Sequence, residues 1–269
     1  LALKGRNINP GFFNPALPAA DLSIAVMAQI DPKKAISGTV DIANDGKVGP
    51  IDKQLLPLLA MRGRLGGNLN AMQIDDVLLD MGAAGKFTGG GAVLRGPQDK
   101  GIGSARFKLH TDRINLKSLY STMKATAIAG DIQLTSAGDV QTLGAQLSER
   151  GMRLDAEATL AKQVLDIKRA RLTAGSGHVD VAGSASLEDK RAFKLGATAV
   201  RFNPSSLGDF PEADINAVVN ASGALAPEWK VASDFTLRPS RLFGQPLSGK
   251  GRFNADAKHI TGVDANFAM

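Results

Sequence analysis

Asp21-Leu22-Ser23-Ile24-Ala25-Val26-Met27-Ala28-Gln29-Ile30 decides the fold class, because every even position in this run is apolar. Successive side chains of a β-strand point to opposite faces, so a period of two predicts a strand with one apolar face. The odd positions carry Asp, Ser and Gln as well as apolar residues, which indicates a wetter opposite face. The run therefore predicts a strand of a half-exposed sheet.

The same alternation returns throughout the chain, so we expect an all-β fold with little helix. Val218 interrupts the polar positions of one later run, which otherwise alternates in the same way. We expect the apolar positions of these runs to share one face, and we call them the candidate lining residues. They are Leu22, Ile24, Val26, Ala28, Ile30, Ile36, Val40, Ile42, Ile132, Leu134, Leu154, Leu160, Ile215, Ala217, Val219, Val231, Phe235 and Leu237.

Helical periodicity is scarce. The best candidate is Pro50 to Met61, which Pro57 interrupts, so it predicts a short helix or an apolar loop. Short helical turns are also expected at 10–13 and 204–207, because Pro suits the first position of a helix.

Three segments of the chain begin alike, at Leu3, Phe107 and Phe193, and each leads through an irregular stretch into a new alternating run. We therefore expect one continuous array of repeats at about 3–104, 107–190 and 193–269, the last truncated. If a strand and its turn take roughly 13 residues, the array holds about 20 strands. Open sheets rarely exceed ~10 strands without curling or splitting, so we expect a long, mostly antiparallel sheet curled into an open groove.

The charge of the chain is mildly positive, at +6, and spread out. Diffuse positive charge favours anionic surfaces such as lipid headgroups. Nucleic acid is not expected as a partner, since it usually needs a concentrated basic stripe with stacking aromatics, and aromatics make up only 5% of the residues. The chain has no cysteine, which excludes disulfides and thiol chemistry. Because it begins with Leu1 and ends within an alternating run, we expect a fragment or a processed chain.

No motif for catalysis, cofactor binding or metal binding stands out, so we do not expect an enzyme. His110, His178 and His259 are far apart in the sequence and lack metal-ligand spacing, which favours solvated positions in alternating runs. The glycine clusters lack the Lys and helix of a phosphate loop, and no Ser lies in a Gly-x-Ser-x-Gly elbow. Asp75, Asp76 and Asp80 are expected on the wetter faces of strands.

Trp229 lies between two expected strands. It is interpreted as a turn aromatic that packs over the apolar edge, with an interface anchor as the alternative.

The carboxy-terminal third of the chain carries a family resemblance. Arg201-Phe202-Asn203-Pro204-Ser205-Ser206-Leu207 is followed by Pro211-Glu212-Ala213-Asp214-Ile215-Asn216-Ala217. Ala221-Ser222-Gly223-Ala224-Leu225-Ala226-Pro227 and Phe243-Gly244-Gln245-Pro246-Leu247-Ser248-Gly249-Lys250-Gly251 come next. This series resembles the central repeats of the TamB family, the translocation and assembly module subunits of Gram-negative bacteria, which are relatives of the AsmA-like proteins. The resemblance is clearest over 193–269 and looser over 1–190.

The resemblance implies a β-taco in the periplasm, a long sheet folded lengthwise around an apolar groove. It implies phospholipid acyl chains as the ligand, carried between the inner and outer membranes, and a role in outer-membrane biogenesis. It further implies the outer-membrane barrel TamA as a partner and an inner-membrane anchor, both through parts of a full-length protein outside this chain.

Two alternatives stay open. A structural or adhesive extracellular β-repeat protein would seal its apolar face into a dry core. A piece of an outer-membrane barrel is disfavoured, because such barrels need aromatic girdles.

Overall fold

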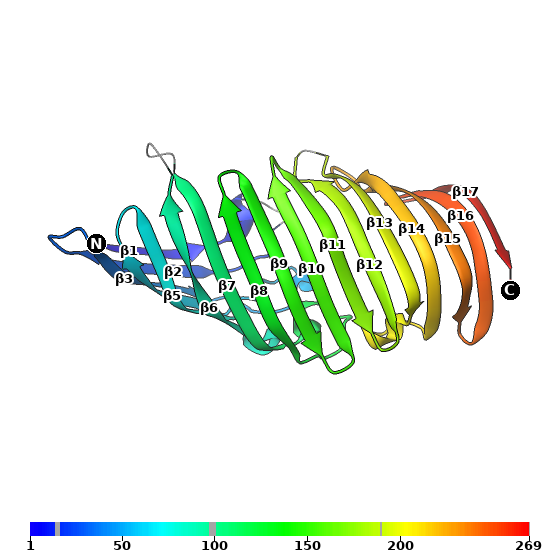
Figure 1. Cartoon of the computed structure of the whole chain (residues 1–269), viewed down its shortest axis with the longest axis horizontal. Coiled ribbons are helices and arrows are strands. Elements are labelled where there is room, and N and C mark those ends of the chain that lie inside the picture. Colours follow the sequence, from blue (N-terminus) through cyan, green and yellow to red (C-terminus); the bar gives the residue numbers. More distant parts are fainter. Residues whose placement is uncertain (14–16, 97–100, 189, 269) are drawn as a thin grey trace. The chain divides into compact units, whose positions relative to one another are not determined.

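The computed structural model describes residues 1–13, 17–96, 101–188 and 190–268. These residues form seventeen β-strands, with helical segments of only three or four residues between some of them (Figure 1). Each strand whose pairing is resolved runs antiparallel to its neighbour in sequence. The expected all-β, antiparallel fold with little helix is confirmed, with seventeen strands among the described residues rather than about twenty. The chain divides into two compact units, Leu1–Gly138 and Asp139–Met269, with the division inside the second expected repeat.

Unit 1 is an eight-stranded antiparallel meander in which each strand pairs with the next. Its strands are β1 (Ala2–Ile8), β2 (Leu22–Ile30), β3 (Ile36–Asn44), β4 (Ala60–Gly67), β5 (Ala71–Asp80), β6 (Lys86–Arg95), β7 (Ile102–Ile114) and β8 (Ile128–Ala137). Its short helical segments are α1 (Pro10–Phe13), η1 (Ile51–Lys53), η2 (Gly82–Ala84) and α2 (Leu116–Leu119). The expected turn at 10–13 is confirmed. Between residue 50 and the start of β4 the helical part is η1, and Leu55 and Leu56 form isolated β-bridges with Ala19 and Val48.

Unit 2 continues the same plan with nine strands. They are β9 (Val140–Glu149), β10 (Met152–Ala161), β11 (Val164–Ala174), β12 (Gly177–Ser186), β13 (Ala192–Phe202), β14 (Ala213–Ala224), β15 (Lys230–Leu242), β16 (Gln245–Asp256) and β17 (Ile260–Ala268). The helical segment η4 (Pro204–Ser206) follows β13, as the Asn-Pro pair predicts.

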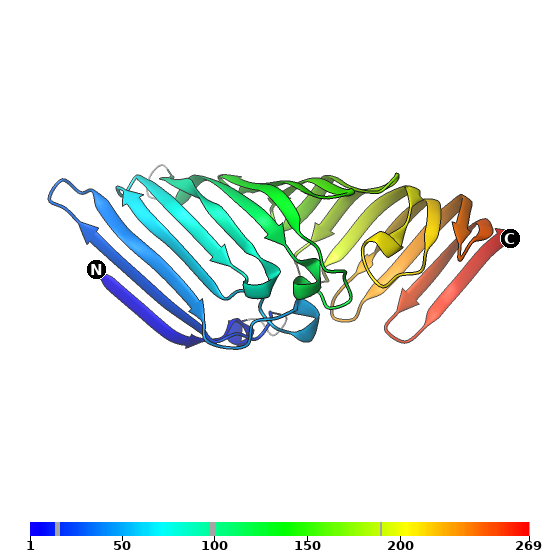
Figure 2. The same cartoon turned by 90° about the horizontal axis from the view of Figure 1, so that it is seen from below.

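The short helical segments of unit 1 all follow odd-numbered strands, so they gather at one edge of the meander (Figure 2). The most buried side chains of the unit lie there, including Ala84 at 1% exposure and Ile114 at 4%. Ser121 donates from its backbone N–H to the Asp52 carboxylate at 2.9 Å, and its hydroxyl donates to the same carboxylate. The connections after β3 and β7 are thereby tied together, and together with the strand ends they form the small core of unit 1.

The three similar segments of the sequence share one local structure. Each strand, β1, β7 and β13, is followed by an Asn whose side chain accepts from the backbone N–H two residues later: Asn9 at 3.0 Å, Asn115 at 3.2 Å and Asn203 at 3.1 Å. This side-chain cap favours the helical turn that follows. Asn115 and Asn203 also accept, at 3.2 Å in both cases, from Thr126 and Ala213, which begin the return to the next strand. The repeated Asn is thus a structural cap.

β-bulges recur on the odd-numbered strands. Pairing registers shift within β1, β5, β7, β11, β13 and β15, between residues three positions apart on each strand. In β5 the shift lies between Ile74 and Val77, and Asp76 has a φ of 50°. A bulge bends its strand and puts two successive side chains on the same face. The bulges therefore return the apolar positions of each strand to one face.

Candidate functional site

One face of unit 1 is built of apolar rows that cross its strands. Residues directly opposite each other in a paired ladder share a face, so the register defines each row. One row runs Ile24, Ile42, Met61, Leu79 and Phe87 across five strands. Neighbouring rows include Val26 opposite Val40, Leu109 opposite Ile132, and Phe107 opposite Leu134. All of the candidate lining residues of unit 1 lie on this face.

Unit 2 has the same organisation over a longer series of strands. One row runs Leu147, Leu154, Leu172, Val179, Ala199, Ala217 and Leu237. The next row runs Ala145, Ala156, Ala170, Val181, Ala197, Val219 and Phe235. Phe235 stacks on Phe267, with ring centroids 5.8 Å apart. We call these two surfaces, one in each unit, the apolar faces.

The apolar faces are only partly covered. Of the eighteen candidate lining residues, Ile36 is buried at 8% exposure, whereas Ile30 and Leu134 are exposed at 62% and 41%. The other fifteen are half-buried. Sealed protein cores bury such residues almost completely. Water therefore reaches most of both faces in the structure.

Sequence reasoning missed several residues of the apolar faces. In unit 1 it missed Leu79, because the bulge in β5 shifts the alternation between Ile74 and Val77, and Phe87, because three glycines follow it in β6. In unit 2 it missed Leu172 and Val179, whose strands contain a bulge or many small residues. Register pairing, rather than the alternation within one strand, places these residues.

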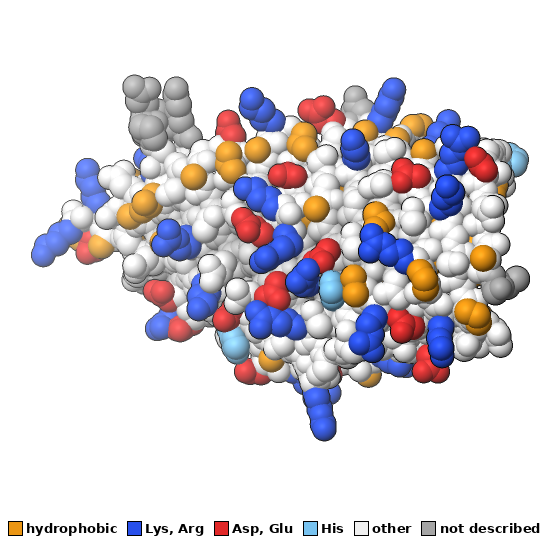
Figure 3. Space-filling model, turned by 45° about the vertical axis from the view of Figure 1, so that its right-hand side comes forward, with side chains coloured by type: hydrophobic (Ala, Val, Ile, Leu, Met, Phe, Trp, Pro, Cys, Tyr) orange, Lys and Arg blue, Asp and Glu red, His pale blue; other side chains and the backbone are white. Residues whose placement is uncertain are grey.

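The opposite face of each unit is polar, and cross-strand ion pairs link its strands. Arg171 and Asp180 make two hydrogen bonds of 2.6 Å, and these bonds hold the pKa of Asp180 below its ordinary value. His110 lies 2.9 Å from Asp131 and 3.2 Å from Asp112. The hydrogen bond to Asp131 is the main cause of a raised His110 pKa, and the bond to Asp112 adds to it. Acidic and basic side chains are interleaved on the face shown in Figure 3. Such exposed pairs stabilise the sheet weakly.

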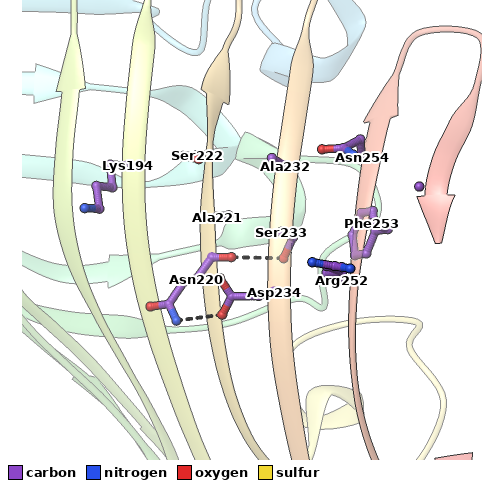
Figure 4. Close-up of a pocket in the computed structure, with 11 residues that line it drawn as sticks. Lys194, Asn220, Ala221, Ser222, Ala232, Ser233, Asp234, Arg252, Phe253 and Asn254 are labelled. Carbon is purple, nitrogen blue, oxygen red and sulfur yellow. Dashed lines mark hydrogen bonds between the residues drawn. The ribbon is translucent and has the colours of Figure 1, made fainter. Parts of the chain in front are cut away.

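The polar face of unit 2 carries a hollow of about 520 Å³ (Figure 4). Its polar groups already bond one another, since Asn220 Nδ2 donates to Asp234 Oδ2 at 2.9 Å and the Ser233 hydroxyl donates to the Asn220 carbonyl at 3.1 Å. Arg252 at its border pairs with Asp264 at 3.2 Å. The hollow is open and mixed in charge, so these groups act mainly as cross-strand links.

The histidines and the tryptophan are exposed or half-buried. His110 lies in β7 and His178 in β12, as expected, but His259 lies in the turn before β17 rather than in an alternating run. Alternation of side chains between two faces arises only where a strand is paired, and His259 precedes the first paired residue of β17. Trp229 lies in the turn between β14 and β15, and 42% of it is exposed. The described residues contain no group of His, Asp or Glu side chains arranged to hold a metal ion.

No family model, curated protein or solved structure matches this chain. Among the described residues, no helix is long and apolar enough to span a membrane.

Proposed function

We propose that the chain binds the acyl chains of phospholipids along its apolar faces and forms part of a lipid-carrying protein like those of the TamB family. In this proposal it lies in the periplasm, carries phospholipid between the inner and outer membranes, and supports outer-membrane biogenesis. Contact with a TamA-like barrel and anchoring in the inner membrane would belong to parts of a longer protein. No catalytic residue, cofactor or metal is needed for this function.

The half-buried state of the candidate lining residues carries the proposal. The chain exposes 16877 Å². Two separate globular units, each of half its mass, would together expose only about 13,400 Å² by the usual relation of area to mass. Apolar surface in contact with water is unfavourable, at about 25 cal/mol per Å². A ligand that is itself apolar and elongated would relieve this cost along several strands at once.

The β-bulges also support the proposal. At Asp75–Asp76 the two successive side chains at the bulge lie on the polar side of β5. The extra residue lengthens the polar side of the strand, which bends the strand around its apolar face. The same shift occurs at Lys168–Arg169 and at Arg238–Pro239 in unit 2. Bending of this sense favours a concave apolar surface, the shape that holds an acyl chain.

The alternative is a structural or adhesive protein with a sealed core. Its apolar residues would be buried by each other, as in a sandwich of two sheets. In the described residues the buried apolar side chains are few: Ile36, Val77, Ala84, Phe87, Ile114, Ala158, Ala174 and Ala213. This number is small for a sealed core of seventeen strands, so the lipid-binding function is favoured.

Photo-crosslinking from two adjacent positions tests the proposal. Val219 lies on the apolar face between Ala197 and Phe235, whereas Val218 lies on the polar face between Thr198 and Thr236. A photoreactive residue at position 219 should capture phospholipid in cells, and the same residue at position 218 should not. The two positions share a strand and a residue type, so the comparison isolates the face.

Mass spectrometry of the crosslinked species distinguishes the outcomes. Lipid adducts at position 219 alone support the proposal. Protein adducts alone at 219, or equal lipid capture at both positions, would contradict it. Native mass spectrometry of detergent-free protein gives a second readout, because a sealed core would retain no lipid.

A further inference from the structure

At one edge of unit 2, large apolar side chains lie exposed in four turns or directly after them. The exposed fractions are 42% for Val164, 50% for Leu187, 53% for Leu225, 42% for Trp229 and 70% for Ile260. These residues lie at the connections that lead into β11, β13, β15 and β17. We call these five residues the turn rim.

The turn rim is ordered by main-chain hydrogen bonds between successive turns. The N–H of Leu187 donates to the carbonyl of Gln163 at 2.7 Å. The N–H groups of Leu225 and Ala226 both donate to the carbonyl of Lys190 at 3.1 Å. Three of the four turns are therefore linked to one another through their main chains. By register Ile260 lies on the apolar face and Val164 on the polar face. Because hairpin turns recur every two strands, successive turns lie about 10 Å apart.

Basic residues accompany the rim. Lys162, Lys190, Arg191, Lys230 and Lys258 lie in or next to the same turns and are all exposed. The same turns carry the exposed acids Glu188 and Glu228, and Asp256 accepts from the backbone N–H groups of Lys258 and His259 at 2.8 Å. Long basic side chains extend their charge toward headgroups while their stems cover apolar surface. The rim thus combines apolar side chains with an excess of exposed basic over acidic residues.

The rim is also continuous with the apolar face. Phe193 and Val231 belong to the outermost row of that face, opposite Gly223, within two residues of the turns. At the other edge of unit 2 the turns at Arg150–Gly151 and Gly175–Ser176 carry no large apolar residue. The other two connections of that edge carry Phe210, at 44% exposure, and Phe243, at 73%.

We propose that the turn rim docks on the surface of a phospholipid bilayer, at the boundary between headgroups and acyl chains. Trp and Lys are residue types found at this boundary, and a series of turns along one sheet edge can contact a plane at several points. A second copy of the chain is a poorer occupant, because an isologous contact would bring the basic residues of two rims together. This inference is independent of acyl binding on the apolar faces, and each can fail alone.

The fluorescence of Trp229 tests the proposal directly, because it is the only tryptophan in the sequence. The chain is titrated with vesicles of phosphatidylethanolamine and phosphatidylglycerol, with and without acyl chains brominated near the headgroup. The emission of Trp229 should shift to the blue and be quenched by the brominated lipid. Leu187→Ser combined with Leu225→Ser should lower the vesicle affinity by about tenfold or more. Phe243→Ser, at the other edge, should leave it unchanged.

Three outcomes would overturn the docking surface. They are an unshifted Trp229 emission at saturating vesicle concentration, an equal loss of affinity in Phe243→Ser, and a blue shift that follows protein concentration without vesicles, which would indicate a second copy. Crosslinking of lipid at position 219 reports on the apolar face alone. Its result therefore separates failure of the rim from failure of acyl binding.

Discussion

Replacement of Val219 by Asp should abolish most lipid binding while leaving the fold intact. Val219 lies in register with Ala197 and Phe235, so no polar side chain of its own row can pair with an introduced carboxylate. The side chain is half-buried, and water reaches it in the absence of ligand. An acyl chain lying over this row would strip that water away.

The expected magnitude follows from desolvation. Covering an unpaired polar group costs at least about 2–3 kcal/mol in proteins, which corresponds to a roughly 30- to 150-fold loss of affinity. Val218→Asp is the matched control, since it makes the same substitution one residue away, between Thr198 and Thr236 on the polar face. Both variants lose the strand preference of Val, at about 1 kcal/mol each. Their stabilities should therefore be similar and their lipid affinities should differ.

Displacement of a fluorescent phospholipid measures affinity, and urea unfolding of the same samples measures stability. The reasoning is refuted if Val219→Asp binds lipid as well as Val218→Asp does. It is also refuted if Val219→Asp loses its fold to the same extent as it loses lipid binding. The loss of binding would then result from lower stability and not from a charge on the apolar face.

Three further predictions concern the stability of the sheet. Asn203→Ala should lower the free energy of unfolding by about 1–2 kcal/mol through loss of its cap, whereas Asn203→Asp should retain most of it, as measured by urea unfolding. The raised pKa of His110 beside Asp131 means that its stabilisation is complete below the ordinary value of 6.5 and is lost as pH rises through the higher folded value. The denaturation midpoint of His110→Gln should therefore change less than that of the unmodified chain between about pH 6 and pH 8; equal changes would exclude this role. Gly183→Val should destabilise by about 2 kcal/mol in thermal unfolding, because Gly183 has a φ of 143° and an added Cβ would overlap the carbonyl oxygen of Lys194.

The sequence predicts strands well where alternation is unbroken. The opening run 21–30 becomes β2, and its even positions lie on one face as expected. This success has a local cause, since side-chain direction in a strand depends only on the parity of the position. The caps after Asn9 and Asn203 are predictable for the same reason, because they involve residues close in sequence.

Features that depend on distant residues could not be predicted in this way. The contact of Asp52 with Ser121 joins residues 69 positions apart, and nothing in either neighbourhood indicates the other. The number of strands was overestimated because β7 and β15 each extend over 13 residues without their turns. The sequence does not predict the turn rim as a whole, because apolar residues in turns leave the alternation of the neighbouring strands unchanged. Only Trp229 stands out in the sequence.

The bulges connect the fold to the proposed function. In a sheet covered by helices on both faces, a strand whose parity changes midway could still bury its apolar residues, because neighbouring layers cover both sides. In this protein, a change of parity would put apolar side chains among the ion pairs of the polar face. The bulge at Asp75–Asp76 avoids this by absorbing two acidic residues on the polar face, so that Ile74 and Val77 both stay on the apolar face. The apolar face is maintained across the bulges, yet it stays half-exposed. Internal packing alone does not require such a face, whereas an elongated apolar ligand would contact it along its whole length.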